Sequence, residues 1–227
     1  MSDSARWSRQ SLAYQFHDIS LLDQALSHRS VGGTNNERLE FLGDAILGML
    51  VAEALYHALP DADEGYLSRL RAHLVRRETL AEIAAEISLG GQIRLGPGEL
   101  KSGGHRRASI LANGLEAVLG AVYLDSGYSA AREVVLCLMR RRMDALPSHD
   151  KLKDPKTRLQ ETLQSTGQDL PAYSIDSVSG EDHRQRFTAS CRLPDSGANT
   201  TGEGRSRRQA EQAAAEAMIA QLEKRNV

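Results

Sequence analysis

The sequence predicts a mainly helical protein, in which an all-helical domain is followed by a small domain of order α-β-β-β-α. From Leu12 to about Leu146 the apolar residues recur at spacings of three and four, the pattern of helices that each bury one face. After a polar stretch the pattern changes to short segments with strand-like alternation, flanked by two helices. A chain of 227 residues is long enough for two unequal domains of this kind.

The first domain is expected over residues 1–146. Its helices are predicted at 11–17, 20–26, 35–55, 63–88, 105–125 and 128–144, with Gly and Pro residues between several of them. Residues 147–155 are polar and end at a proline, so they are the expected linker. Residues 156–227 form the second domain, with helices predicted at 157–165 and 206–222 and strands at 172–178, 184–193 and 199–202.

Composition excludes several classes of protein. Apolar residues make up 41% of the chain and charged residues 26%, which is average for a globular protein and excludes a disordered or fibrous one. The longest runs without polar residues have eight members, far below the ~20 that a membrane helix needs. No membrane association is expected. Cys137 and Cys191 lie far apart in the sequence, so we expect buried, reduced thiols of a cytoplasmic protein.

One predicted helix carries three carboxylates on one face. Glu37, Glu40 and Asp44 lie at positions i, i+3 and i+7, so they point within about 60° of one another. Most of the remaining circumference is apolar, which indicates a buried helix. Buried carboxylates at close quarters cannot all stay ionised without a compensating cation. The apolar surroundings of these carboxylates therefore favour a cation site.

A second apolar helix repeats the pattern with Asn113 and Glu116. If the two helices pack face to face, Glu40, Asp44, Asn113 and Glu116 converge as oxygen donors without His or Cys. Such a set suits Mg²⁺ or Mn²⁺ better than zinc. The alternative is that each carboxylate is an exposed group on its own helix, and spacing alone leaves both interpretations open. No organic cofactor is expected.

Charge totals do not identify a partner, because the chain has 28 basic and 30 acidic residues, whose charges nearly cancel. Position is more informative. Arg205, Arg207 and Arg208 surround the start of the last predicted helix, where cations oppose the helix dipole. A phosphate backbone docked at this point would satisfy the dipole, the free amides and the guanidinium groups together. A solvated charge cluster is the alternative, but the α-β-β-β-α order is typical of modules that bind double-stranded RNA.

Several motifs together resemble the ribonuclease III family. Residues Asn36-Glu-Arg-Leu-Glu-Phe-Leu-Gly-Asp44 are similar to its most characteristic segment. Further segments follow in family order: Ser27 to Ser30, Asp63 to Gly65, Leu95 to Gly103, and the helix from Leu111 to Ser126. Residues 154–224 are similar to the double-stranded RNA-binding domain of the family. The resemblance covers nearly the whole chain and is closest to the short bacterial form.

The resemblance implies an endoribonuclease that hydrolyses double-stranded RNA by divalent-metal catalysis, processing ribosomal RNA precursors and other structured transcripts. It implies a homodimer, with Phe41 packed into the partner subunit. Glu40, Asp44 and Glu116 match metal ligands, and Asn113 occupies the position of a fourth. Glu37 and Glu64 match acidic positions that support cleavage. The matched RNA contacts are Thr157, Gln160, Glu161, His183, Arg205, Ser206, Arg207 and Arg208.

Two residues depart from the family pattern. Asn113 stands where an aspartate is typical, and an amide oxygen can coordinate a metal but carries no charge. Glu211 stands where many such RNA-binding modules carry a lysine. The first departure motivates an alternative function, a double-stranded RNA-binding protein with weak or absent cleavage. For Glu64, which follows Asp61 and Asp63, the alternative is a role in capping its helix.

Overall fold

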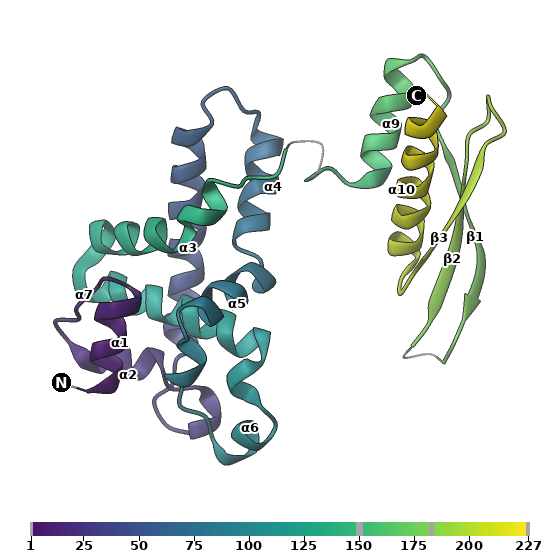
Figure 1. The fold of residues 1–227 in the computed structure, drawn as a ribbon. Coiled ribbons are helices and arrows are strands. Elements are labelled where there is room, and N and C mark those ends of the chain that lie inside the picture. The colour runs from purple at the N-terminus through teal and green to yellow at the C-terminus, as the bar shows by residue number, and fades with distance from the viewer. Residues whose placement is uncertain (1, 149–151, 182–183, 226–227) are drawn as a thin grey trace. The chain divides into compact units, whose positions relative to one another are not determined.

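The computed structural model describes the whole chain except residues 1, 149–151, 182–183 and 226–227. The described residues form two compact units, Met1–Pro147 and Ser148–Val227. The first is all-helical and the second has the order α-β-β-β-α (Figure 1). The predicted mainly helical fold is therefore confirmed.

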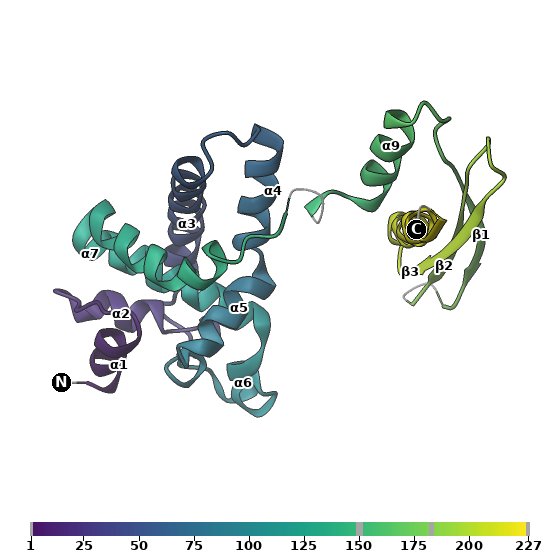
Figure 2. The same ribbon diagram turned by 45° about the horizontal axis from the view of Figure 1, so that its top comes forward.

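The helices of the first unit are α1 (Asp3–Ser11), α2 (Ile19–Ala25), α3 (Glu37–Ala58), α4 (Glu64–Leu74), α5 (Arg77–Glu86), α6 (Pro97–Lys101) and α7 (Ala108–Met143). Three 3₁₀ turns, Arg29–Val31, Leu89–Gly91 and Gly104–Arg106, join them. The core lies where α7 crosses α3, and these two helices share the most extensive contact in the unit (Figures 1 and 2). Leu47, Leu50, Leu115 and Leu119 are fully buried there.

Glycines set how closely α3 and α7 approach. A Cβ atom added at Gly43 would overlap the backbone carbonyl of Glu116, and one added at Gly120 would overlap the carbonyl of Leu39. The two backbones are therefore in direct contact at the crossing. Only glycine permits this contact, because any other residue carries a Cβ atom. The crossing brings Glu40 and Asp44 of α3 next to Glu116 of α7.

The N-terminal region differs from the prediction. The helix expected at 11–17 is wrong, because α1 ends at Ser11 and Ala13 has a positive φ of 51°. The Ser8 hydroxyl donates a hydrogen bond to the Tyr14 carbonyl at 2.8 Å and holds the chain in a turn. Trp7 donates from its indole Nε1 to the Ile87 carbonyl at 2.7 Å, which fixes α1 on the end of α5.

The single helix predicted at 63–88 is also wrong. The structure has two helices, α4 and α5, because Arg76 is extended, with φ −66° and ψ 152°. The buried Thr79 hydroxyl donates to the His73 carbonyl at 3.0 Å and accepts from Arg76 Nε at 3.2 Å. These bonds stabilise the turn without any glycine or proline, so the apolar period gave no sign of the break.

Other expectations have mixed outcomes. Gly127 has non-helical φ and ψ inside α7, which agrees with the predicted division into 105–125 and 128–144. Helix α7 is long and apolar enough to cross a membrane by length and composition, but 61% of an apolar 18-residue stretch within it is buried inside the fold. It is the core helix of this unit.

The prediction of two buried cysteines is only half confirmed. Cys191 is buried as expected, whereas the expected burial of Cys137 is wrong, because Cys137 is exposed on α7.

The second unit consists of α9 (Pro155–Ser165), β1 (Ala172–Ser179), β2 (Arg186–Arg192), β3 (Asn199–Gly204) and α10 (Arg207–Arg225). The strands form an antiparallel sheet in the order β1-β2-β3, with a bulge between Ile175 and Ser177. Both helices cover the same face of this sheet (Figures 1 and 2). Leu159, Leu163, Cys191 and Met218 are buried between the helices and the strands.

Asp125 fastens the loop after α1 to α7. Its carboxylate accepts hydrogen bonds from the Tyr14 hydroxyl and from the backbone N–H groups of His17 and Asp18 at 2.9 and 2.8 Å. Burial alone would raise the pKa of Asp125, but these hydrogen bonds outweigh it and lower the pKa to about 2. The side chain is 1% exposed, so solvent screens these bonds little.

We expect Asp125→Asn to lower the free energy of unfolding by about 2 kcal/mol at neutral pH, from the fall of the pKa below its ordinary value of 3.8. The pKa is depressed in the folded state, so this contribution is present above pH 3.8 and is lost as the pH falls towards 2. Urea unfolding of both proteins at several pH values measures the effect. A difference that persists at the acid end would contradict it, and exposed Asp61→Asn is the control.

We expect Gly43→Ala to lower the free energy of unfolding by about 3 kcal/mol, because the added methyl group must push α3 away from α7. Gly48, in the same helix, is the matched control, because nothing lies within 4 Å of a Cβ atom added there. Gly48→Ala should raise the free energy of unfolding by about 0.5–1 kcal/mol through helix propensity alone. Equal effects of the two substitutions in urea unfolding would show that the crossing tolerates a wider separation.

Candidate active site

A cleft of ≈ 680 Å³ lies beside the crossing of α3 and α7. Glu37, Glu40, Phe41 and Asp44 line it from α3. From α7 it is lined by Ser109, Ile110, Ala112, Asn113 and Glu116. All four predicted metal-binding residues thus border one cleft. Of the other acids predicted for the site, Glu37 joins them at the rim.

The acids in the cleft influence one another. Burial raises the pKa of Glu116, and the nearby carboxylates of Asp44 and Glu40 raise it further, to about 7. Burial also raises the pKa of Glu40, against the hydrogen bond that it accepts from the Asn113 side chain. Three carboxyl groups therefore lie within electrostatic reach of one another in a partly desolvated place, where they cannot all be ionised at low cost. Such an arrangement is unfavourable unless a cation or a proton compensates the charge.

The donor set fits a hard divalent cation, since it offers three carboxylates and one amide oxygen and no sulfur or imidazole. These side chains do not yet form a complete coordination geometry. Across the part of the chain that the structure describes, no group of three or more His, Cys, Asp or Glu side chains is already placed to hold a metal ion. The Asn113 side-chain amide donates a hydrogen bond to Glu40, and its oxygen is the atom that could coordinate a cation.

Glu64 does not line this cleft. It is the first residue of α4, and its carboxylate accepts a hydrogen bond from the Ser68 hydroxyl at 2.7 Å. Asp63 caps the same helix by accepting from the Tyr66 N–H at 2.7 Å. Within one chain, Glu64 therefore stands apart from Glu40, Asp44 and Glu116.

Basic residues also line the cleft, and the sequence reasoning did not select them. Arg29 pairs with Glu37 at 3.4 Å, and Arg107 pairs with Glu99 at 2.9 Å. Arg77, the first residue of α5, lies near enough to Glu116 to lower its pKa. Arg76-Arg77 and Arg106-Arg107 each precede or begin a helix, as Arg205 to Arg208 do at α10. Paired arginines near a helix start were therefore the feature of the sequence from which Arg77 and Arg107 could have been selected.

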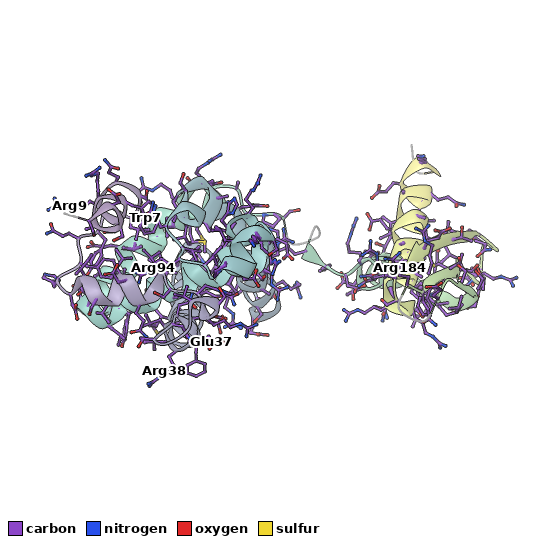
Figure 3. The ribbon with its side chains drawn as sticks, turned by 90° about the horizontal axis from the view of Figure 1, so that it is seen from below. Trp7, Arg9, Glu37, Arg38, Arg94 and Arg184 are labelled. Carbon is purple, nitrogen blue, oxygen red and sulfur yellow. The ribbon has the colours of Figure 1, made fainter. Side chains whose placement is uncertain are left out.

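In the second unit, most of the predicted RNA contacts lie at the surface. Thr157, Gln160 and Glu161 are exposed on α9, and Arg205, Ser206, Arg207 and Arg208 are exposed around the start of α10. Ser206 caps α10 by accepting from the Gln209 N–H at 3.2 Å. His183 lies outside the described residues. Figure 3 shows Arg184 among the side chains of this unit.

Ion pairs join the two helices of the second unit. Lys156 of α9 pairs with Glu211 of α10 at 2.6 Å and stacks over the Tyr173 ring at 4.3 Å. Asp154, which caps α9, accepts from Gln212 and from Arg208 at 3.5 Å. Glu211, one of the two departures from the family pattern, is thus half of an ion pair that fixes α9 to α10.

Two family models match the chain. The model described as Ribonuclease-III-like matches residues 18–142, and the Double-stranded RNA binding motif matches residues 155–222. The first match covers more than half of the chain and contains the whole cleft. The chain belongs to the ribonuclease III family. The expectation of an endoribonuclease specific for double-stranded RNA, with a nuclease domain and an RNA-binding domain, is thereby confirmed.

Individual relatives agree with this membership in the ribonuclease III family. The chain is 55% identical to Ribonuclease 3 of Alkalilimnicola ehrlichii over 212 residues, which cover 93% of each chain. It is 50% identical to Ribonuclease 3 of Photobacterium profundum over 98% of this chain and all of the relative. A solved nuclease domain of ribonuclease III from Campylobacter jejuni covers 64% of this chain, and all of that domain, with 40% identity and a TM-score of 0.61.

Proposed function

We propose that Glu40, Asp44, Asn113 and Glu116 bind Mg²⁺, with Mn²⁺ as a substitute, and that this centre cleaves double-stranded RNA. The observation that carries the proposal is the group of three carboxylates at the α3–α7 crossing, where burial, Asp44 and Glu40 raise the pKa of Glu116 to about 7. Four oxygen donors border one cleft, and a cation would offset the repulsion between the acids.

When bound, a divalent cation lowers the pKa of the attacking water and neutralises charge at the scissile phosphate. The side chains of this chain provide position and charge. Glu40, Asp44 and Glu116 hold the cation with anionic oxygens, and Asn113 adds a neutral one. Glu37 lies at the rim, where it can orient water or a second ion. Glu64 is proposed to support cleavage as well, from a position outside the cleft of its own chain.

We further propose a homodimer. Phe41, Met49 and Tyr56 are 81%, 48% and 68% exposed and share an arc of about 80° on α3. Leu124 and Tyr128 of α7 are also exposed. An apolar stripe of this kind is typical of a protein interface. One solved Campylobacter jejuni nuclease domain, 43% identical with a TM-score of 0.58 over 60% of this chain and 95% of that one, is described as flexible in a region involved in dimer formation.

Residues 1–146 are proposed as the nuclease and dimerisation domain, residues 147–155 as the linker and residues 156–227 as the RNA-binding domain. In the last, Thr157, Gln160, Glu161 and His183 are proposed to contact the grooves of the duplex. Arg205, Ser206, Arg207 and Arg208 are proposed to bind phosphates, which their exposure at the start of α10 supports. Precursors of ribosomal RNA and other structured transcripts in the cytoplasm are the proposed substrates.

Asn113 favours one alternative function. A neutral ligand weakens the attraction for a cation, so the chain could bind duplex RNA and cleave it slowly or not at all. Arg205 to Arg208 and α9 would support binding equally well in both cases. Only cleavage itself distinguishes the two functions.

Glu116→Gln should lower the rate of duplex RNA cleavage in Mg²⁺ by about 100-fold or more, because it removes an anionic ligand from a centre that already has a neutral one. Binding of the duplex, measured by fluorescence anisotropy in EDTA, should persist, because most of the proposed binding residues lie in the other domain. Glu133→Gln, an exposed acid on the same helix, is the control and should leave both unchanged. Equal loss of cleavage and binding would show that Glu116 is not a metal ligand.

Asn113→Asp should reach half of its maximal cleavage rate at roughly five- to tenfold lower Mg²⁺ concentration than the natural protein, because the added charge strengthens cation binding. Mn²⁺, which stands higher in the affinity order, should narrow the difference. Without metal the same substitution should lower the free energy of unfolding, because it replaces a donor to Glu40 with a fourth carboxylate.

Initial rates against metal concentration and urea unfolding in EDTA measure the two effects of Asn113→Asp. Superimposable rate curves would show that residue 113 does not touch the metal. An inactive natural protein that Asn113→Asp activates would favour the binding-only alternative.

A further inference from the structure

The negative charge of the cleft opposes the approach of RNA, which is itself negatively charged. A phosphodiester strand must approach five carboxylates, those of Glu37, Glu40, Asp44, Glu99 and Glu116. Bound cations offset part of this charge, but the phosphates on either side of the scissile bond also need partners. Arg29 also borders the cleft, but it pairs with Glu37 at 3.4 Å and lies in a 3₁₀ turn, not at the start of an α-helix.

Two other arginines enter the cleft from the starts of helices. Arg107 precedes α7 and Arg77 is the first residue of α5. Neither α5 nor α7 has a side-chain hydrogen bond capping its N-terminus. A cation beside an uncapped helix start opposes the dipole and leaves amide N–H groups without partners. An anion at the same place would satisfy both.

Arg107 is held in place. Its Nη1 atom lies 2.9 Å from one oxygen of Glu99 and 3.2 Å from the other, and its Nη2 lies 3.3 Å from the Ser102 hydroxyl. The side chain is still 47% exposed, and it borders the cleft together with Asn113. Glu99 and Ser102 therefore hold the two terminal nitrogens of the guanidinium group, and its remaining N–H groups can donate to a second anion.

Arg77 is held less tightly. Its side chain is exposed, and it makes no hydrogen bond or salt bridge with any residue that the structure describes, although its charge acts on Glu116. Its neighbour Arg76 is committed to Thr79 in the turn between α4 and α5. Arg77 is thus the residue at this helix start that can reach an anion in the cleft.

We propose that Arg77 and Arg107 bind backbone phosphates of the RNA strand beside the bond that is cut. The two residues line the cleft together with the acids and would supply the nuclease domain with its own phosphate contacts, next to the proposed metal centre. The inference rests on the proposed function. It predicts that each arginine contributes to the electrostatic part of substrate recognition and releases counterions when the duplex binds.

The test measures kcat/KM of the full-length protein on a duplex RNA between about 50 and 200 mM salt. Arg77→Ala and Arg107→Ala should each lower kcat/KM by about tenfold at the low-salt end and reduce the slope of log kcat/KM against log salt by about one. Arg77→Lys and Arg107→Lys keep the charge and should keep the slope. A purely structural role would change kcat without changing the slope.

Arg106→Ala and Arg71→Ala are the matched controls. Arg106 is adjacent to Arg107 but lines a different depression with His105 and Leu111, and Arg71 is an exposed residue of α4 outside the cleft. Both should keep the natural slope. An unchanged slope in Arg77→Ala or in Arg107→Ala, or an equal reduction in the controls, would overturn the assignment. A natural protein that cuts no duplex at any salt or metal concentration would contradict the proposed function instead.

Discussion

The direct contact between the backbones of α3 and α7 is the constraint on which the rest of the nuclease unit depends. Gly43 and Gly120 permit this contact, since a Cβ atom on either would overlap the other helix. Glu40 and Asp44 lie on both sides of Gly43 in sequence, and Glu116 lies one turn before Gly120. The same contact that packs the core thus forces the carboxylates together. Close packing of the two helices and repulsion between their carboxylates therefore occur together at the α3–α7 crossing.

Much of this arrangement could be predicted from the sequence, because it follows from helical period. The spacing of Glu37, Glu40 and Asp44 places them on one face, and the solitary polar groups of the second helix, Asn113 and Glu116, identify the facing side. The glycines at the crossing were not predicted, because a glycine in a helix indicates close approach only when the facing residue is known. Arg77 and Arg107 were missed because their helix starts were placed too early or not at all.

The errors in secondary structure have a common physical cause. Helix period describes which face is buried, but it does not reveal where a helix ends when side-chain hydrogen bonds stabilise the turn. The break between α4 and α5 depends on Thr79, and the end of α1 depends on Ser8. Both are polar side chains that donate to a backbone carbonyl six residues away. Breaks that glycine causes, such as the one at Gly127, were found.

The two units share one way of presenting positive charge. In α5, α7 and α10, arginines stand at or beside the helix start, although this position disfavours cations. In the nuclease unit these arginines border an acidic cleft, and in the second unit they lie on the surface. In each unit, taken by itself, an anion at such a helix start would meet guanidinium groups together with the positive end of the helix dipole.

Anomalous diffraction from crystals of the protein grown with Mn²⁺ tests the central claim most directly, because it locates the cation without reference to activity. The account predicts an anomalous peak at the α3–α7 crossing, within bonding distance of carboxylate oxygens of Glu40, Asp44 and Glu116. It also predicts that the peak disappears in Glu116→Gln crystals grown in the same way. A cation bound elsewhere in the cleft, or no peak at saturating Mn²⁺, would contradict the account.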